Sequence, residues 1–202
     1  MSTFDERAKD WDTAERRARA DEVASAIRAN VPLAATDRVV DVGAGTGLLG
    51  LALADDAGEL VLAEPSDGML AVINEKLAGG DLPQVSAVKF DLPNDPPPGE
   101  AFDLAVSLLV LHHLDDTAAA LAAIRRLLRP GGRMALADLD TEDGTFHSVE
   151  SEGIHHLGFD RGALTDLARA AGFVDVEART AMEIGREDGR RFPVFLLLGR
   201  NP

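Results

Sequence analysis

Short aliphatic runs alternate along the chain with longer stretches in which apolar residues recur every three or four positions. The short runs are too brief for helices and end in glycine, proline or acidic residues, so they predict buried strands. They cover residues 39–42, 60–63, 85–90, 102–110, 134–137, 174–180 and 193–198. The periodic stretches between them predict helices with one buried face. They cover residues 12–29, 46–54, 66–77, 117–128 and 160–171.

Polar residues stand where several of these helices begin. Ser66, Asp116 and Asp160 each precede a periodic stretch and are predicted N-caps, because their side-chain oxygens accept hydrogen bonds from free backbone amides. Asp12 and Glu15 have the spacing of a capping box at the first long helix. Residues 129–132, Arg-Pro-Gly-Gly, are predicted to end the helix that precedes the fifth strand.

The order of these elements indicates an α/β fold. Five strands alternate with helices, and two further strands flank a turn that contains Asp188 and Gly189. Parallel strands need crossover connections of this length, whereas a closing hairpin makes one strand antiparallel. We therefore expect a single domain whose sheet is parallel except for one strand.

Charge limits the classes of partner. Among 202 residues, 35 are Asp or Glu and 20 are Lys or Arg, so the formal net charge is −15. A field of this sign opposes binding to nucleic acid and to anionic membranes, and we expect neither as a partner. Basic residues gather at 16–19, 125–129 and 186–191. Their interleaving with acids or their helical spacing favours an interpretation as solvated helix faces.

Other absences narrow the picture further. The chain has no cysteine, which excludes disulfides, thiolate zinc sites and a cysteine nucleophile. It has no apolar run approaching the roughly twenty residues of a membrane span, and its first ten residues are polar rather than signal-like. We therefore expect a cytoplasmic protein without membrane insertion.

Residues 38–47, Arg-Val-Val-Asp-Val-Gly-Ala-Gly-Thr-Gly, carry the clearest chemical signal. Gly43, Gly45 and Gly47 remove side chains where a turn after a buried strand must let a ligand approach the backbone. Asp41 stands at the carboxyl end of that strand, where open α/β sheets bind their ligands. A carboxylate there repels a pyrophosphate and favours a cation.

A nicotinamide cofactor is the alternative, because residues 45–50 match the dinucleotide pattern GxGxxG and Glu64 lies at the distance of a ribose-binding acid. Counted from Gly43, however, the third glycine position is occupied by Leu48, and Asp41 opposes a diphosphate. The chain also lacks tyrosine, which many short-chain oxidoreductases use. An NAD(P)-dependent oxidoreductase stays the alternative function, beside a module that binds its cofactor without turnover.

The glycine turn closely resembles motif I of the class I S-adenosylmethionine (SAM)-dependent methyltransferases. Residues 111–114 (Leu-His-His-Leu), 128–132 (Leu-Arg-Pro-Gly-Gly), 171–173 (Ala-Gly-Phe) and 5–12 resemble the small-molecule branch related to the ubiquinone and menaquinone C-methyltransferases. The resemblance implies a doubly wound, Rossmann-like sheet of seven strands with helices on both faces. It also implies SAM as the cofactor, S-adenosylhomocysteine (SAH) as its product and a small-molecule acceptor methylated at oxygen, carbon or nitrogen.

The family pattern assigns the cofactor pocket position by position. Asp41, Gly43 and Gly45 would face the methionine end, Gly47 would allow close helix packing, and Glu64 would accept hydrogen bonds from the ribose hydroxyls. The remaining positions implied to contact the cofactor are Pro65, Met69, Asp91, Leu92 and Ser107.

Histidines are the candidate bases, because an acceptor that must lose a proton needs a group with a pKa near the working pH. All five lie in two segments at the expected carboxyl edge of the sheet. We predict that His113, His155 or His156 contacts the substrate. The acidic segment 138–156 also contains potential metal ligands, but it lacks the spacing of a metal motif. We interpret it as a solvated loop that doubles as a lid, and we predict no metal.

We expect the single domain, residues 1–202, to have three parts. Residues 1–30 would form a helical lid segment, and residues 31–140 the SAM-binding half. Residues 141–202 would contain the substrate loop, the last helix and the closing hairpin. The expected assembly is a monomer or a homodimer, and the sequence does not identify the acceptor.

Overall fold

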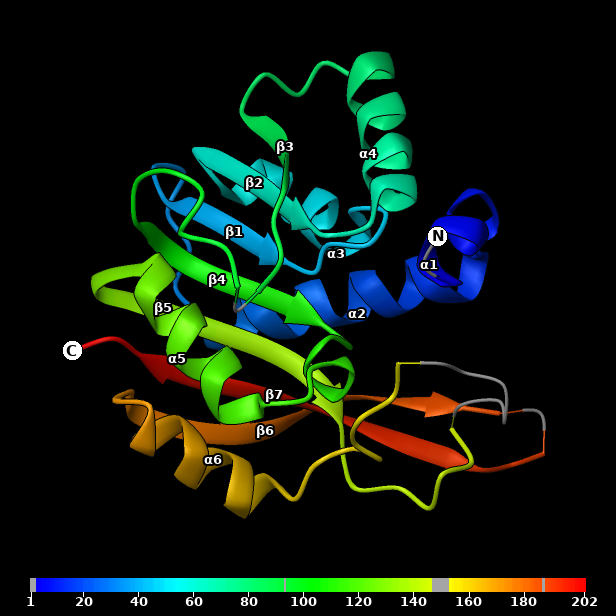
Figure 1. Cartoon of the computed structure of the whole chain (residues 1–202), viewed down its shortest axis with the longest axis vertical. Helices are drawn as coiled ribbons and strands as arrows, with labels where there is room; N and C mark the ends of the chain where they lie inside the picture. The colour runs from blue at the N-terminus through cyan, green and yellow to red at the C-terminus, as the bar shows by residue number, and fades with distance from the viewer. Residues whose placement is uncertain (1–2, 93, 147–152, 187) are drawn as a thin grey trace.

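The computed structural model describes residues 3–92, 94–146, 153–186 and 188–202. Its described residues form a seven-stranded sheet in the order β3-β2-β1-β4-β5-β7-β6 (Figure 1). β7 runs antiparallel to both of its neighbours, and the other pairs are parallel. The strands are β1 Arg38–Val42, β2 Glu59–Glu64, β3 Val85–Lys89, β4 Phe102–Leu108, β5 Leu128–Leu139, β6 Val174–Gly185 and β7 Arg191–Arg200. The predicted fold class is confirmed.

Helices cover both faces of this sheet. The α-helices are α1 Thr3–Arg7, α2 Ala14–Asn30, α3 Leu48–Ala52, α4 Asp67–Gly79, α5 Thr117–Leu127 and α6 Arg161–Ala170, and the 3-10 turns are η1 Ala8–Asp10, η2 Ala54–Asp56 and η3 Leu111–His113. None of the helices in the described part of the chain is long and apolar enough to cross a membrane.

Two apolar layers, one on each face, hold the helices to the sheet. Val39 points into a layer with Ile27 of α2 and Ile73 of α4, whereas Val40 points into a layer with Leu121 of α5 and Leu164 of α6. Successive strand residues face opposite sides, so the uninterrupted aliphatic run of β1 is buried on both. This burial fixes the carboxyl end of β1 at the centre of the sheet edge.

The predicted caps of three helices are confirmed. Ser66, Asp116 and Asp160 accept hydrogen bonds from backbone amides in the first turns of α4, α5 and α6. At α2 the prediction was wrong, because the N-cap is Thr13, which accepts from the amide of Arg16. The carboxylate of Asp12 is turned instead toward other elements of the fold, as described below.

Several strand ends also differ from the predictions. β4 stops at Leu108 because Leu109 adopts φ 58°, and this turn leads the chain into η3. β5 begins at Leu128, so residues 129–132 continue into the strand, with a register shift opposite Phe102 and Leu104 of β4. β6 and β7 are both longer than predicted, because each extends along its partner beyond the sheet core.

Candidate functional site

The carboxyl ends of β1, β2 and β4 border a cavity of about 740 Å³. The glycine turn after β1 forms part of its wall, and η3 forms another part. Residues of α1 and α2 cover it from the N-terminal side, and Phe146 and Arg186 from the side of the β6–β7 hairpin. The cavity therefore lies where a ligand site is expected in an open α/β sheet.

The glycine turn is shaped by close packing. Gly43 has φ 66°, and a Cβ atom placed on it would lie 2.8 Å from both methyl groups of Val110. Gly47 is the left-handed N-cap of α3, with φ 83°. A Cβ on Gly50, one turn into α3, would lie 2.3 Å from Cδ2 of Leu62. The close approach of this helix to the sheet therefore depends on Gly50 as well as on the predicted Gly47.

Asp41 is buried at the base of the cavity. Its side chain is 1% exposed, and its Oδ2 accepts a 2.8 Å hydrogen bond from the backbone amide of Gly50. Burial, and to a lesser extent the nearby Glu64 carboxylate, raises the pKa of Asp41 to about 7, against the lowering effect of the hydrogen bond from the Gly50 amide. A buried carboxylate with one hydrogen bond favours a cationic partner, which would offset its desolvation.

Glu64 supports the turn from the neighbouring strand. One carboxylate oxygen accepts from the amide of Gly45 at 2.7 Å, and the other accepts from the amide of Ser66 at 2.9 Å. Burial raises the pKa of Glu64 although both of these bonds lower it. Each oxygen has a second lone pair, so the same side chain can also accept from two ligand hydroxyls.

The other positions predicted to contact a cofactor divide into two groups. Pro65 and Met69 lie on the cavity wall beside Glu64. Four others are absent from the described lining, namely Gly47, Asp91, Leu92 and Ser107. Asp91 is exposed and accepts a 3.0 Å hydrogen bond from Asn94, and the Oγ of Ser107 is buried without a hydrogen-bond partner among the described residues. The contacts of all these residues with a cofactor stay predictions.

An N-terminal strap, residues 3–13, crosses the edge of the cavity. Asp5 anchors its first end, because its Oδ1 accepts from the Oγ of Ser66 at 2.6 Å and from the amide of Gly68 at 3.0 Å. Asp12 anchors the second end through an ion pair of 2.7 Å with Lys76 and a hydrogen bond from Thr46. These contacts explain why Asp12 does not cap α2.

Aromatic side chains of the strap lie over the cavity. Phe4 meets His113 edge to face at 5.2 Å between ring centroids and Trp11 at 5.9 Å. Nε1 of Trp11 is 3.8 Å from the position that a Cβ atom would take on Gly45. Figure 1 shows α1 and the start of α2 beside the carboxyl edge of the sheet, and their role as a lid stays a prediction.

The three histidines predicted to contact substrate are placed differently. His113 lies on the cavity wall, and its Nδ1 donates to the carbonyl of Gly153 at 2.8 Å, so Nε2 is the basic nitrogen of the neutral ring. His155 and His156 are not in the described lining. The side chain of His155 is 44% exposed, and Nε2 of His156 lies 3.0 Å from the carbonyl of Leu114.

His112 pairs with a buried acid that the sequence interpretation did not assign. Its Nδ1 lies 2.7 Å from Oδ1 of Asp138, and the two side chains are 1% and 0% exposed. The backbone carbonyl of His112 also accepts from the amides of His155 and His156. Asp138 lies one residue before the end of β5, the neighbour of β4 in the sheet, so it meets the segment that follows β4 at the same edge.

Comparison with known proteins identifies this architecture. Residues 40–134 match a protein family described as a methyltransferase domain. A demethylmenaquinone methyltransferase of Clavibacter sepedonicus is 36% identical over 115 residues, which are 56% of this chain and 45% of that protein. The ubiquinone/menaquinone biosynthesis C-methyltransferase of Teredinibacter turnerae is 38% identical over 106 residues, which are 50% and 43%. These likenesses support membership of the class I SAM-dependent methyltransferases.

A solved structure has the same fold over the whole chain. It is a complex between the Haloferax volcanii Trm112 methyltransferase activator and a methyltransferase, and it aligns with a TM-score of 0.80 at 23% identity. The alignment covers 100% of this chain and 99% of that one. The chain spans about half the length of the two curated relatives named above.

Several acids in the segment after β5 that could serve as metal ligands make contacts with other protein groups instead. Asp140 pairs with Arg161 at 2.6 Å, and Oε2 of Glu142 accepts from the amides of Thr145 and Phe146. No group of three His, Asp or Glu side chains suited to a metal ion occurs among the described residues. His147, Glu150 and Glu152 lie outside them.

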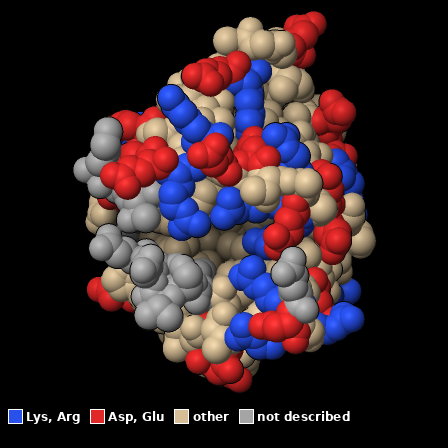
Figure 2. Space-filling model, turned by 90° about the vertical axis from the view of Figure 1, so that its right-hand side faces the viewer, with Lys and Arg blue, Asp and Glu red and all other residues tan. Residues whose placement is uncertain are grey.

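The interpretation of the basic groups as solvated helix faces was wrong for Arg16 and Arg19, which are half-buried on the cavity wall, and residues 186–191 lie at a hairpin rather than on a helix. Arg186, which follows β6, and Arg7 also line the cavity. Figure 2 looks onto this side of the molecule and shows a central hollow bordered by Lys and Arg side chains. Residues far apart in the sequence thus give the site a positive border that their local spacing did not reveal.

Proposed function

We propose that this protein is a SAM-dependent methyltransferase, which transfers a methyl group from SAM to a small-molecule acceptor. The observation that carries the proposal is the pair of buried carboxylates, Asp41 and Glu64, at the carboxyl ends of adjacent strands on one cavity. SAM offers an ammonium group for the first and two ribose hydroxyls for the second. The glycine turn between them leaves the backbone accessible along one wall.

The residues of the chain would do most of their work by binding and orientation. When bound, SAM supplies a methyl group on a positively charged sulfur, which is an activated leaving group. Asp41 would hold the methionine end, and Glu64 would hold the ribose while it fixes the turn through the amides of Gly45 and Ser66. Correct placement of the acceptor then supplies much of the rate acceleration.

His113 is the residue we assign as base for an acceptor that must lose a proton. It lies on the cavity wall, and its hydrogen bond to the carbonyl of Gly153 leaves Nε2 as the basic nitrogen. We assign His112 a positioning role, because Asp138 holds its ring and its carbonyl holds the segment of His155 and His156.

The size and charge of the site support a small acceptor. The cavity of about 740 Å³ has the volume of a site for a cofactor and a small molecule. The net charge of −15 opposes nucleic acid as a substrate. The proposal includes a cytoplasmic location and a monomeric or homodimeric state, which fractionation and light scattering would check.

Calorimetric titration of the purified protein with SAH tests the cofactor assignment, with NADH and NAD⁺ as controls. We expect micromolar binding of SAH and none of either nicotinamide cofactor. Binding of NADH or NAD⁺ without SAH would overturn the proposal. A screen of small acceptors with methyl-labelled SAM then separates an enzyme from a module that binds SAM without turnover, because only the enzyme releases SAH in proportion to methylated product.

A further inference from the structure

Part of the cavity wall is strongly cationic in a protein that is otherwise acidic. The side chains of Arg7, Arg16, Arg19 and Arg186 all line the cavity, although the net charge of the chain is −15. Three of them come from the N-terminal strap and α2, and the fourth comes from the far end of β6. Gathering like charges in a partly enclosed space is unfavourable unless an anion is bound among them.

Arg19 is the most buried member of this group. Its side chain is 13% exposed, and its one ion pair among the described residues joins it at 2.9 Å to Glu15, whose side chain is 63% exposed. Its Nε is buried without a hydrogen-bond partner among the described residues. Burial lowers the pKa of Arg19, and the charges of Arg16 and Arg186 lower it further, against the raising effect of Glu15.

Arg186 faces Arg19 from the hairpin side and is held there by Phe146. Its Nη2 donates to the carbonyl of Phe146 at 2.8 Å, and its guanidinium lies 5.0 Å from the centre of the Phe146 ring. Neither contact neutralises the charge. Within the described residues, Arg186 forms no ion pair.

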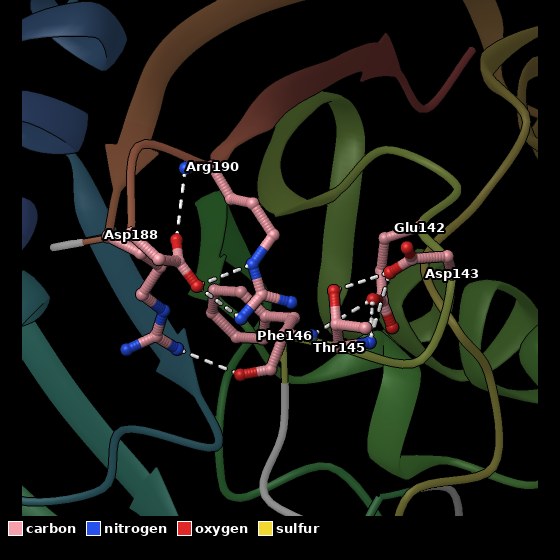
Figure 3. Close-up of polar contacts among 7 residues, drawn as sticks. Glu142, Asp143, Thr145, Phe146, Asp188 and Arg190 are labelled. Carbon is pink, nitrogen blue, oxygen red and sulfur yellow. Dashed lines mark hydrogen bonds and ion pairs between the residues drawn. The ribbon is translucent and has the colours of Figure 1, made fainter.

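The described acids on the hairpin side of the cavity bind groups other than Arg19 and Arg186 (Figure 3). Glu142 accepts from the amides of Thr145 and Phe146, and Asp143 accepts from Thr145. The charge of Arg186 contributes to the lowered pKa of Asp188, but the carboxylate of Asp188 is paired with Arg190 at 2.6 Å. Among the described acids, the exposed Glu15 pairs with Arg19 and none pairs with Arg186.

The cofactor accounts for only one of the cations. SAM carries a single carboxylate, next to the ammonium group that we assign to Asp41. Arg16 is placed to meet it, because Arg16 stacks on Trp11 at 4.0 Å and Trp11 lies against Gly45 of the glycine turn. Of the other three, Arg7 lies over the ring of Trp11. The charges of Arg19 and Arg186 act on each other, and these two are the pair that we assign to a second anion.

We propose that the methyl acceptor carries an anionic group, a carboxylate or a phosphate, which Arg19 and Arg186 bind beside the ring of Phe146. The inference rests on the proposed function, because it assumes that the rest of the cavity holds SAM. Guanidinium groups suit this task, since their planar donors match the oxygens of both anions.

The test uses the complex of the full chain with SAH, in which the carboxylate site of the cofactor is already filled. Benzoate and inorganic phosphate are titrated as probes, and benzamide serves as the uncharged match for benzoate. We expect at least one anion to bind the complex and benzamide to bind at least tenfold more weakly than benzoate. Arg19→Gln and Arg186→Gln should each weaken anion binding at least tenfold while SAH affinity stays within twofold.

Arg191→Gln is the matched control, because Arg191 lies on the same hairpin, is 73% exposed and is absent from the described lining of the cavity. It should leave anion binding unchanged.

SAH binding without binding of either anion, or benzoate binding that benzamide equals, would overturn the anion subsite alone. A selective loss of SAH affinity in the two variants would assign these arginines to the cofactor carboxylate and would also overturn it. Failure of the unmodified protein to bind SAH would instead defeat the proposed function.

Discussion

The carboxylate of Asp41 accepts a 2.8 Å hydrogen bond from the amide of Gly50 across the narrow gap between β1 and α3. This single bond holds a side chain that is 1% exposed. The gap is so narrow that a Cβ atom placed on Gly50 would lie 3.0 Å from the same carboxylate. Asp41 is therefore held firmly in a place that destabilises its charged form, as expected for a residue retained for ligand binding.

Binding of SAH should weaken as the pH falls. The pKa of Asp41 is raised to about 7 in the unliganded protein, so the carboxylate that an ammonium group requires is lost below that pH. We expect the affinity to fall toward about tenfold per pH unit below neutrality. Calorimetry between about pH 8 and pH 6 measures this slope. An affinity that stays constant over the range would show that Asp41 does not face the ammonium group.

Asp41→Asn should stabilise the unliganded protein while it impairs ligand binding. Because folding raises the pKa of Asp41 from 3.8 to about 7, the folded state binds its proton more tightly than the unfolded chain does. Stability is therefore lost as the pH rises from 3.8 to about 7, and asparagine should restore up to about 4 kcal/mol at about pH 8. Thermal unfolding at about pH 8 and pH 5 checks the difference.

The affinity of Asp41→Asn for SAH is the second measurement. We expect it to fall at least tenfold, because one charge-assisted contact is lost. A variant that is destabilised at both pH values would contradict the assigned cause of the pKa shift. A stable variant with unchanged SAH affinity would remove Asp41 from the cofactor site.

Glu64→Gln should weaken SAH binding more than its small change in size suggests. One of the amides of Gly45 and Ser66 would then face the new NH₂ group instead of an acceptor. We expect at least about a tenfold loss of SAH affinity and a loss of stability of roughly 1–3 kcal/mol. Glu59→Gln is the control at the other end of β2, where the side chain is 47% exposed and pairs with Arg38. Equal effects of the two variants would argue against ribose recognition.

His113→Gln should lower the rate of methyl transfer without affecting cofactor binding. A general base contributes about 10²- to 10⁴-fold to a proton transfer, so the fall in kcat should exceed tenfold for an acceptor that loses a proton. His155→Gln is the control, because His155 is 44% exposed and lies outside the described lining of the cavity. Full activity of His113→Gln, with SAH affinity preserved, would leave positioning alone as the mechanism.

Lys76→Met should loosen the N-terminal strap. Lys76 pairs with Asp12 and donates to the carbonyl of Thr46, so its removal frees one anchor and the turn beneath it. We expect faster proteolytic cleavage within residues 3–13 and SAH affinity reduced by about tenfold, as for the loss of a hydrogen bond to a charged group. Lys89→Met removes an exposed pair with Asp67 at the start of α4 and should change neither property. Unchanged cleavage in Lys76→Met would contradict the role of this anchor.

The helices and strands, and their order along the chain, could be predicted from the sequence. Ser66, Asp116 and Asp160 were correctly predicted as caps because a cap needs only a side chain and the amides of the next turn. Asp12 was wrongly predicted as the cap of α2, because its carboxylate pairs instead with Lys76, which lies on another helix. The aliphatic strands were found because strands buried on both faces leave continuous apolar runs.

Only the tertiary structure decided which side chains share the cavity. His113 reaches its wall whereas His155 and His156 turn away, because the segment that follows β5 is bonded to the carbonyl of His112. Arg19 and Arg186 come together across two elements of the fold. Local periodicity determined the sheet, the glycine turn and Asp41 at its carboxyl edge, since these depend on neighbours in the chain. The charge of the binding site depended on contacts between distant segments, which no local pattern records.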